Sequence, residues 1–297
     1  MELFKGSNID FIAYRKWFYA FSITLFLIGI GALVARRGPR LGIDFTGGTL
    51  VQVKFKELPH VDKIRESLTA GGFEGYSLQT QPDNNTIIVR LKSAGQGNAI
   101  GPKVIDALKK QFTGNVNEIP DRVEFVGPVI GRSLIMNAFI SIFGSLSLIV
   151  IYVAYRFKNW LWGTIGVLAL AHDVFVTFSL LVVLNREVTL VIIAALLTLA
   201  GYSINDTIVI FDRVRENLRL SRKEERKALY NRSVNETLGR TINTSLTAFI
   251  AACSLFFAGE VIRDFALCMA FGIFIGTYSS IFCVTVIDHW QSRHRPN

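Results

Sequence analysis

The chain has 297 residues, of which 51% are hydrophobic, and its mean hydropathy is +0.38. Soluble globular domains of this size seldom carry so much apolar surface, so most of the chain must face lipid or other membrane helices. The formal net charge of +9 could indicate nucleic-acid binding, but membrane topology and contact with anionic lipid explain it, so no nucleic acid is expected as a partner.

Six runs of about 18 or more residues carry few charges, which is the length of a helix that crosses a bilayer. These predicted spans are residues 17–34, 134–155, 160–184, 188–211, 241–258 and 265–287. No small-residue cleavage site follows the first run, so residues 1–35 are expected to stay as an N-terminal segment and membrane anchor. The predicted fold class is an α-helical polytopic membrane protein, in which residues 132–290 form the other five spans.

Residues 36–131, between the first two spans, have the length and mixed composition of a small domain. Their periodicity predicts strand 49–55, helix 61–70, strands 76–81 and 86–91, helix 102–112 and strand 122–126, with a hairpin turn at 82–85. This βαββαβ order is the ferredoxin-like pattern. Because that fold serves many unrelated functions, it indicates only a binding or docking module.

Asp44, Gly47 and Gly48 lie where the first span meets this domain. Their spacing could suggest a phosphate-binding loop, but the Lys-Ser/Thr ending that such a loop needs is absent. We therefore favour the other interpretation, a tight turn that leads into the first strand. The domain also lacks a nucleophile elbow, an HExxH sequence or another catalytic motif, so we expect neither an enzyme nor a cofactor.

Two carboxylates lie inside predicted spans, where a charged side chain costs about 2.5–3.5 kcal/mol on insertion scales. Asp173 follows His172 in the third span, and Asp206 lies in the fourth span, about two turns from its end. Asn205 precedes Asp206, and Tyr202 shares a helical face with it. This polar stripe should face other helices, and each carboxylate is a candidate functional group.

The fifth span offers a complementary polar face, made of Arg240, Asn243, Thr244 and Thr247. Small residues on the same span would allow another helix to approach closely. We expect Arg240 to pair with Asp206 across the helix contact, so that protonation of the carboxylate releases the pair. A carboxylate whose charge controls the position of a neighbour is what a proton relay needs.

Structural interpretations of the same residues stand beside the relay. Arg240 lies at the edge of its span and could simply anchor the helix to headgroups. Asp206 and Asp173 could each satisfy a hydrogen-bonding need of a neighbouring helix. A metal site at His172 and Asp173 is disfavoured, because adjacent residues on a helix point apart and no further ligand cluster is visible.

Residues 213–239, between the fourth and fifth spans, are predicted to form a basic cytoplasmic loop. Eight Lys or Arg residues lie from Arg213 to Arg232 and alternate with glutamates. This pattern is typical of a surface helix that lies on anionic headgroups. Contact with a partner protein is the alternative.

The short loops predict the orientation of the chain, because Lys and Arg collect on the cytoplasmic side. The segments read as inside carry most of these residues, whereas the short outside loops carry only Arg186 and Arg263. Both termini, including the tail 291–297, are therefore predicted to be cytoplasmic and residues 36–131 to lie outside. Arg36, Arg37 and Arg40 oppose this orientation, and five other segments outweigh them.

Five stretches of the chain carry a resemblance to a known family. They are LGIDFTGGT at 41–49, VGPVIG at 126–131, AHDV at 171–174, GYSINDTIVIFDR at 201–213 and RTINTSLT at 240–247. These long, ordered motifs resemble those of the SecF family of protein-export membrane proteins, which belongs with the resistance-nodulation-division transporters.

The resemblance implies a multi-pass subunit of the bacterial inner membrane that pairs with SecD and associates with the SecYEG channel and YajC. It also implies use of the proton-motive force to promote late translocation of preproteins, with residues 36–131 in the periplasm. The family's proton-pathway positions carry over to Asp206 and Arg240, together with an aspartate of SecD that this chain lacks. The path would then lie between the two subunits.

Two other functions are alternatives. A proton-driven exporter of small molecules or lipids from the same superfamily would need larger periplasmic pockets than one domain of this size provides. An intramembrane aspartyl protease also has two aspartates in neighbouring spans, but its GxGD-type motif is absent because Ser-Ile-Asn precedes Asp206. Co-purification with SecD would separate these functions.

Overall fold

A computed structural model of the chain describes residues 7–81, 84–91, 100–117, 119–157, 160–221, 223–258 and 260–294. The chain forms two compact units, Met1–Arg40 with Ile140–Asn297, and Leu41–Phe139. Pro82 and Asp83 of the predicted hairpin turn, and the last three residues of the predicted tail, lie outside the described residues.

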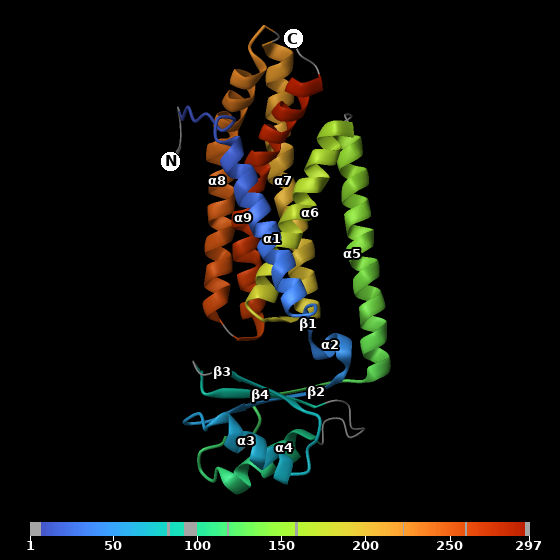
Figure 1. Ribbon diagram of the computed structural model, residues 1–297, viewed down its shortest axis with the longest axis vertical. Coiled ribbons are helices and arrows are strands. Elements are labelled where there is room, and N and C mark those ends of the chain that lie inside the picture. The colour runs from blue at the N-terminus through green and yellow to red at the C-terminus, as the bar shows by residue number, and fades with distance from the viewer. Residues whose placement is uncertain are drawn as a thin grey trace. The chain divides into compact units, whose positions relative to one another are not determined.

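Six helices in the described part of the chain are long and apolar enough to cross a membrane, which confirms the number of predicted spans (Figure 1). They are α1 (Arg15–Ala35), α5 (Pro128–Phe157), α6 (Trp160–Val183), α7 (Leu190–Leu220), α8 (Arg226–Ala258) and α9 (Glu260–His294). Their apolar residues surround each helix because lipid or another helix lies on every side.

Helix α9 lies at the centre of the first unit and packs against α6, α7 and α8 (Figure 1). Gly272 and Gly276 let α7 come close, because a Cβ at Gly272 would stand 2.6 Å from Leu199 Cδ1 and one at Gly276 would stand 3.1 Å from Ser203 Cβ. Small residues commonly mediate helix packing where lipid supplies no hydrophobic driving force between helices. The α7–α9 contact is therefore set by two glycines one turn apart.

Within the first unit, residues 140–157 of α5 stand apart from the other helices except at their last turns (Figure 1). Leu148, Ile151 and Tyr155 are exposed on it, whereas Val153 and Phe157 near its end join the buried core of the first unit. An ion pair between Arg156 of α5 and Asp212 of α7 lies at the same end. Within the described residues, α5 is thus attached to the other helices mainly through its last turns.

Residues 213–239, predicted to form a loop between two spans, are helical over most of their length. Helix α7 continues to Leu220 and α8 begins at Arg226, so both predicted spans extend as helices into this region. No proline interrupts either extension, and pairs such as Arg213 with Glu216 stabilise the helix surface. Hydropathy detects only the apolar part of a helix, so the predicted spans ended too early.

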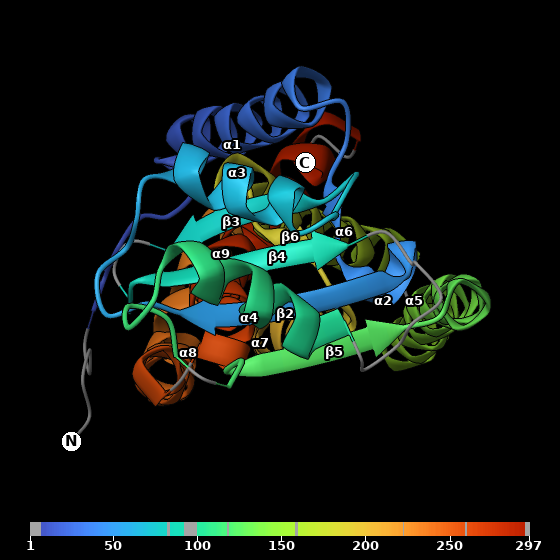
Figure 2. The ribbon, with the colours of Figure 1, turned by 90° about the horizontal axis from the view of Figure 1, so that it is seen from below.

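The second unit contains a four-stranded antiparallel sheet with strand order β3-β4-β2-β5. Its elements are α2 (Ile43–Thr46), β2 (Gly48–Lys54), α3 (Val61–Ala70), β3 (Ser77–Gln81), β4 (Thr86–Leu91), α4 (Ile100–Gln111) and β5 (Arg122–Val126). The order of strands and helices from β2 to β5 is the predicted one. Both α3 and α4 cover the same face of the sheet (Figure 2).

The core of this unit follows from alternation along the strands. Val51 and Val53 of β2 and Val89 of β4 are fully buried, and they pack against Leu68 of α3 and Leu108 of α4. Side chains two residues apart on a strand share a face, so the alternating valines form one apolar surface for the helices to cover.

Two further short strands are β1 (Arg40–Leu41) and β6 (Glu187–Val188). The Arg40 guanidinium donates to the Glu187 carboxylate at 3.5 Å, and Arg36 donates to the Val183 carbonyl at 2.9 Å. Two of the arginines that opposed the predicted orientation therefore have partners within the first unit.

Candidate functional site

Asp206 lies near the middle of α7 and is buried, with 2% of its surface exposed. The Ser245 hydroxyl of α8 donates to its Oδ2 at 3.2 Å. The Thr277 hydroxyl of α9 lies 2.6 Å from Ser245 Oγ and 2.8 Å from the carbonyl of Ile273. A chain of polar groups thus runs from α7 through α8 to α9.

Arg240 does not form the ion pair with Asp206 that we expected. Within the described residues Asp206 has no cation at ion-pair distance, and Arg240 is exposed on α8. Each of the five steps from Arg240 to Ser245 turns the helix by about 100°, so the side chains of these two residues point to different sides of α8.

The other predicted polar residues lie on the outside of this chain. Asn243, Thr244 and Thr247 are exposed beside Arg240, and the Thr244 hydroxyl donates to the Arg240 carbonyl at 3.0 Å. On α7, Asn205 is exposed and Tyr202 is half-buried. We call Asn205, Arg240, Asn243, Thr244 and Thr247 the polar stripe. Asp206 therefore lies inside the bundle, whereas the stripe faces outward.

Asp173, near the middle of α6, is fully buried and has more hydrogen bonds than Asp206. Its Oδ2 accepts from the hydroxyls of Ser203 on α7, at 2.5 Å, and Ser279 on α9, at 2.6 Å. His172 Nδ1 lies 3.0 Å from Oδ1. No group of three or more His, Cys, Asp or Glu side chains in the described part of the chain could hold a metal ion.

A five-residue segment of α9, Gly276 to Ser280, connects these groups. Thr277 contacts Ser245, which bonds Asp206, and Ser279 bonds Asp173. Ser280 Oγ lies 3.0 Å from Thr207 Oγ1 on α7. The Tyr278 hydroxyl donates to the Phe18 carbonyl on α1 at 2.6 Å. The sequence prediction missed this segment. Its signal was a run of four hydroxyl-bearing residues in an otherwise apolar span.

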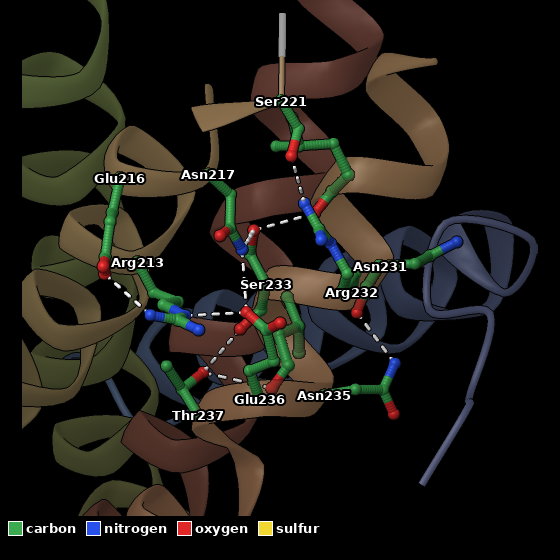
Figure 3. Close-up of polar contacts among 12 residues, drawn as sticks. Arg213, Glu216, Asn217, Ser221, Asn231, Arg232, Ser233, Asn235, Glu236 and Thr237 are labelled. Carbon is green, nitrogen blue, oxygen red and sulfur yellow. Dashed lines mark hydrogen bonds and ion pairs between the residues drawn. The ribbon is translucent and has the colours of Figure 1, made fainter. Parts of the chain in front are cut away.

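The ends of α7 and α8 next to their connection are held together by a second polar network (Figure 3). Arg213 donates to Glu216 and to Glu236, both at 2.7 Å. The buried Asn217 side chain donates to Glu236 at 2.7 Å and to Ser233 at 2.9 Å. These bonds fix the hairpin that carries Asp206 on one helix and Ser245 on the other.

The N-terminal segment is held against α8 by two asparagines one turn apart. The Ile9 N–H donates to Asn235 Oδ1 at 3.0 Å, and Asn235 Nδ2 donates to the Ile9 carbonyl at 2.9 Å. Asn231 accepts from the Ile12 N–H at 3.2 Å. The segment before α1 is thus attached to the start of α8.

Asp10 strengthens this attachment. Burial raises the pKa of its carboxyl group, but hydrogen bonds from the Ala13 N–H and Asn231 and the Lys227 ammonium at 3.2 Å outweigh that effect, so the pKa lies below its usual value. A lowered pKa in the folded state means that the contact contributes above the usual carboxyl pKa and weakens as the pH falls through the lowered value.

The turn at Gly47 and Gly48 has the geometry that the sequence suggested. Their φ angles are 69° and 126°, in the region that side chains with a Cβ rarely adopt. Asp44 lies in the short helix α2 just before the turn, and β2 starts at Gly48. A Cβ at Gly131 of α5 would stand 3.3 Å from the Gly47 nitrogen, so the turn also needs a glycine on its neighbour.

Family comparisons agree with these features. The C-terminal region of the protein-export membrane proteins SecD and SecF matches residues 103–293, and the GG motif of SecD and SecF matches residues 32–57. The second match includes the Gly47–Gly48 turn, and the first includes both buried aspartates.

Several curated relatives are named protein translocase subunit SecF. The one from Endomicrobium trichonymphae is 39% identical to this chain, covering 98% of this chain and 94% of the relative. The one from Thermodesulfovibrio yellowstonii is 38% identical, with 97% and 96% covered, and the one from Pseudomonas aeruginosa is 36% identical, with 96% and 92% covered.

Two solved structures are similar over nearly the whole chain. The crystal structure of SecDF from Thermus thermophilus, described as a translocon-associated membrane protein, has a TM-score of 0.86 and 36% identity over 99% of this chain. SecDF in a super-membrane-facing form has a TM-score of 0.70 and 35% identity over 98% of it. This chain spans 40% of the length of each of those chains.

Proposed function

Since this chain belongs to the SecF family of protein-export membrane proteins, we propose that it works with SecD as a proton-driven accessory subunit of the Sec translocase. The observation that carries the proposal is the buried Asp206 carboxylate, bonded by Ser245 and flanked by the outward polar stripe. In this proposal the subunit promotes late translocation of preproteins and catalyses no covalent reaction.

A buried carboxylate within a membrane-spanning helix suits proton coupling on energetic grounds. A charged side chain there costs about 2.5–3.5 kcal/mol, and one proton that moves down 100 mV supplies about 2.3 kcal/mol. The two quantities are similar. Gain or loss of one proton at Asp206 could therefore shift the packing of α7 against α8, where the only donor in the described residues is the Ser245 hydroxyl.

The polar stripe supports a partner within the membrane. Asn205, Arg240, Asn243 and Thr244 are exposed on spanning helices, where lipid cannot satisfy polar groups. SecD is the partner that we propose for this surface, because the similar solved structures are of SecDF and this chain spans only 40% of the length of each. Arg240 would then meet an acidic residue of SecD.

The wider assembly in this proposal includes the SecYEG channel, YajC, the translocating preprotein and anionic lipid. The chain lies in the bacterial inner membrane with both termini cytoplasmic. Residues 36–131 form a ferredoxin-like periplasmic domain in this arrangement, which the strand order β3-β4-β2-β5 supports. The extended ends of α7 and α8 then lie in the cytoplasm.

The test is export of a secreted reporter in cells that lack the native subunit. Wild type should restore export, and Asp206→Asn and Arg240→Ala should fail at matched membrane levels while SecD still co-purifies. Asp264→Asn is the matched control, because Asp264 is a carboxylate of α9 that pairs with Arg186 at 3.6 Å, apart from the Asp206 chain. Full export by the Asp206→Asn variant would contradict the proposal that Asp206 is a proton relay.

A further inference from the structure

Ser245 differs from the other hydroxyl-bearing residues of α8 in what its side chain bonds. Ser233, Thr244 and Ser254 each donate to the carbonyl four residues earlier on their own helix, at 2.7, 3.0 and 2.9 Å. This back-bonding is the usual arrangement for Ser and Thr inside a helix. Ser245 instead donates to Asp206 Oδ2 across the helix contact. Something must hold it there against the competing carbonyl.

Thr277 is the group placed to hold it. Its Oγ1 lies 2.6 Å from Ser245 Oγ, closer than Ser245 lies to the carboxylate, and it reaches Ser245 from a third helix. A hydroxyl that donates to Ser245 Oγ uses a lone pair of that oxygen and leaves its proton for the carboxylate. Hydrogen bonds linked in this way also strengthen one another.

The same three groups can satisfy both charge states of Asp206. When the carboxylate is charged, Thr277 donates to Ser245 and Ser245 donates to Asp206. When Asp206 carries a proton it can donate to Ser245, which then donates to Thr277, and Thr277 donates to the Ile273 carbonyl at 2.8 Å. Only hydroxyl rotations separate the two patterns, so no proton is lost or gained along the chain beyond the one on Asp206.

We propose that Thr277 is a positioning residue for Asp206, because its hydroxyl holds Ser245 on the carboxylate and lets the hydrogen-bond chain reverse when Asp206 exchanges a proton. This inference rests on the proposed function for its role in export. The placement of the hydroxyls does not depend on that role. Thr277 itself exchanges no proton with a substrate.

The charged and titratable side chains around Asp206 do not take the place of Thr277 as the hydrogen-bond donor to Ser245. Arg240 is exposed on α8, and the Tyr202 hydroxyl of α7 is buried near Ser245 but makes no hydrogen bond within the described residues. Asp173 on α6 accepts its hydrogen bonds from Ser203 and Ser279. Tyr278 on α9 donates to a carbonyl of α1. In the described part of the chain, the contact from α9 to the Ser245–Asp206 pair is therefore the uncharged hydroxyl of Thr277.

Infrared difference spectra of the full chain, purified with SecD, test the hydrogen bonds directly. Subtraction of the Asp206→Asn spectrum isolates the Asp206 carboxyl band. Thr277→Val, which removes the hydroxyl and keeps the shape, should shift this band, whereas Thr277→Ser should leave it in place. Thr285→Val is the matched control, since Thr285 is a buried threonine of α9 that donates to its own helix at Phe282. An unshifted band in Thr277→Val, or the same shift in Thr277→Ser, overturns the proposal.

Export measurements then test the functional part. Thr277→Val should slow reporter export about 3- to 10-fold, which is the range that the loss of one hydrogen bond supports, and Thr277→Ser should restore it. A defect that Thr277→Ser shares assigns Thr277 to packing and overturns the proposal. If Asp206→Asn itself exports normally while the band still shifts in Thr277→Val, the proposed function fails and the placement of Thr277 stands.

Discussion

At the level of single side chains, the two buried aspartates have different surroundings. Asp173 receives two short hydroxyl bonds from different helices and lies beside His172. Asp206 receives one longer bond, from Ser245. A carboxyl group with several fixed donors is held in one place, whereas one with a single donor can change its partner at lower cost. We therefore assign Asp173 to joining α6, α7 and α9, and the change of charge state to Asp206.

This assignment predicts that the bonds to Asp173 support the fold. Ser279→Ala should lower the free energy of unfolding by about 1–3 kcal/mol, because it leaves a buried acceptor with one donor fewer. Ser254→Ala, on the exposed side of α8, should change it by less than about 0.5 kcal/mol. Thermal unfolding of the full chain in detergent measures both, and equal losses would contradict the assignment.

At the level of elements, α9 organises the membrane unit. Its glycines admit α7, and its hydroxyl-bearing residues reach α1, α6, α7 and α8. Close approach and polar contact depend on each other here, since short side chains such as Ser and Thr bridge two helices only when the backbones are near. The described glycine and hydroxyl contacts of this kind are on α9 and not on α5, so the two helices should respond differently to added volume.

Gly272→Ala should destabilise the chain by about 1–3 kcal/mol, because the new Cβ would overlap the fully buried side chain of Leu199. Gly144→Ala on α5 is the control, because nothing lies within 4 Å of the added carbon. That change should be neutral or stabilise the helix by up to about 1 kcal/mol. Thermal unfolding of both variants at equal lipid content compares them, and a loss in Gly144→Ala as large as in Gly272→Ala would rule out the packing explanation.

At the level of the whole molecule, the surface of the membrane unit is of two kinds. Helix α5 exposes apolar side chains, including Met136, Leu148 and Tyr155, which suit lipid. The polar stripe on α7 and α8 does not suit lipid, and it lies next to the Asp206 chain. A subunit that covers the stripe would satisfy these polar groups and would also control access to Asp206. This arrangement explains why one chain carries only part of the proposed proton path.

A bulky substitution on each surface should show which of the two binds SecD. Thr247→Trp on the stripe should reduce co-purification of SecD about tenfold, since overpacking an interface costs about 1–3 kcal/mol. Leu148→Trp on α5 should leave co-purification unchanged, because that position is exposed on the apolar surface. Quantitative pull-down at matched membrane levels gives both values. Loss of SecD from the Leu148 variant alone would place the interface on α5.

The sequence by itself determined the features that depend on local periodicity. Hydropathy identified six spans, alternation identified the strands of the second unit, and the cost of buried charge identified Asp173 and Asp206. The glycine pair at the GG turn could be predicted because a positive φ angle restricts the choice of residue.

Only the tertiary structure decided which groups meet these residues. Ser245 and not Arg240 lies on Asp206, Ser279 bonds Asp173, and residues 213–239 extend two helices. Periodicity shows which residues share a face of one helix, but not which helix packs on that face. The partners of the two aspartates lie 30 to 106 residues away along the chain, and the glycines of α9 and the rotation of α8 bring them into contact.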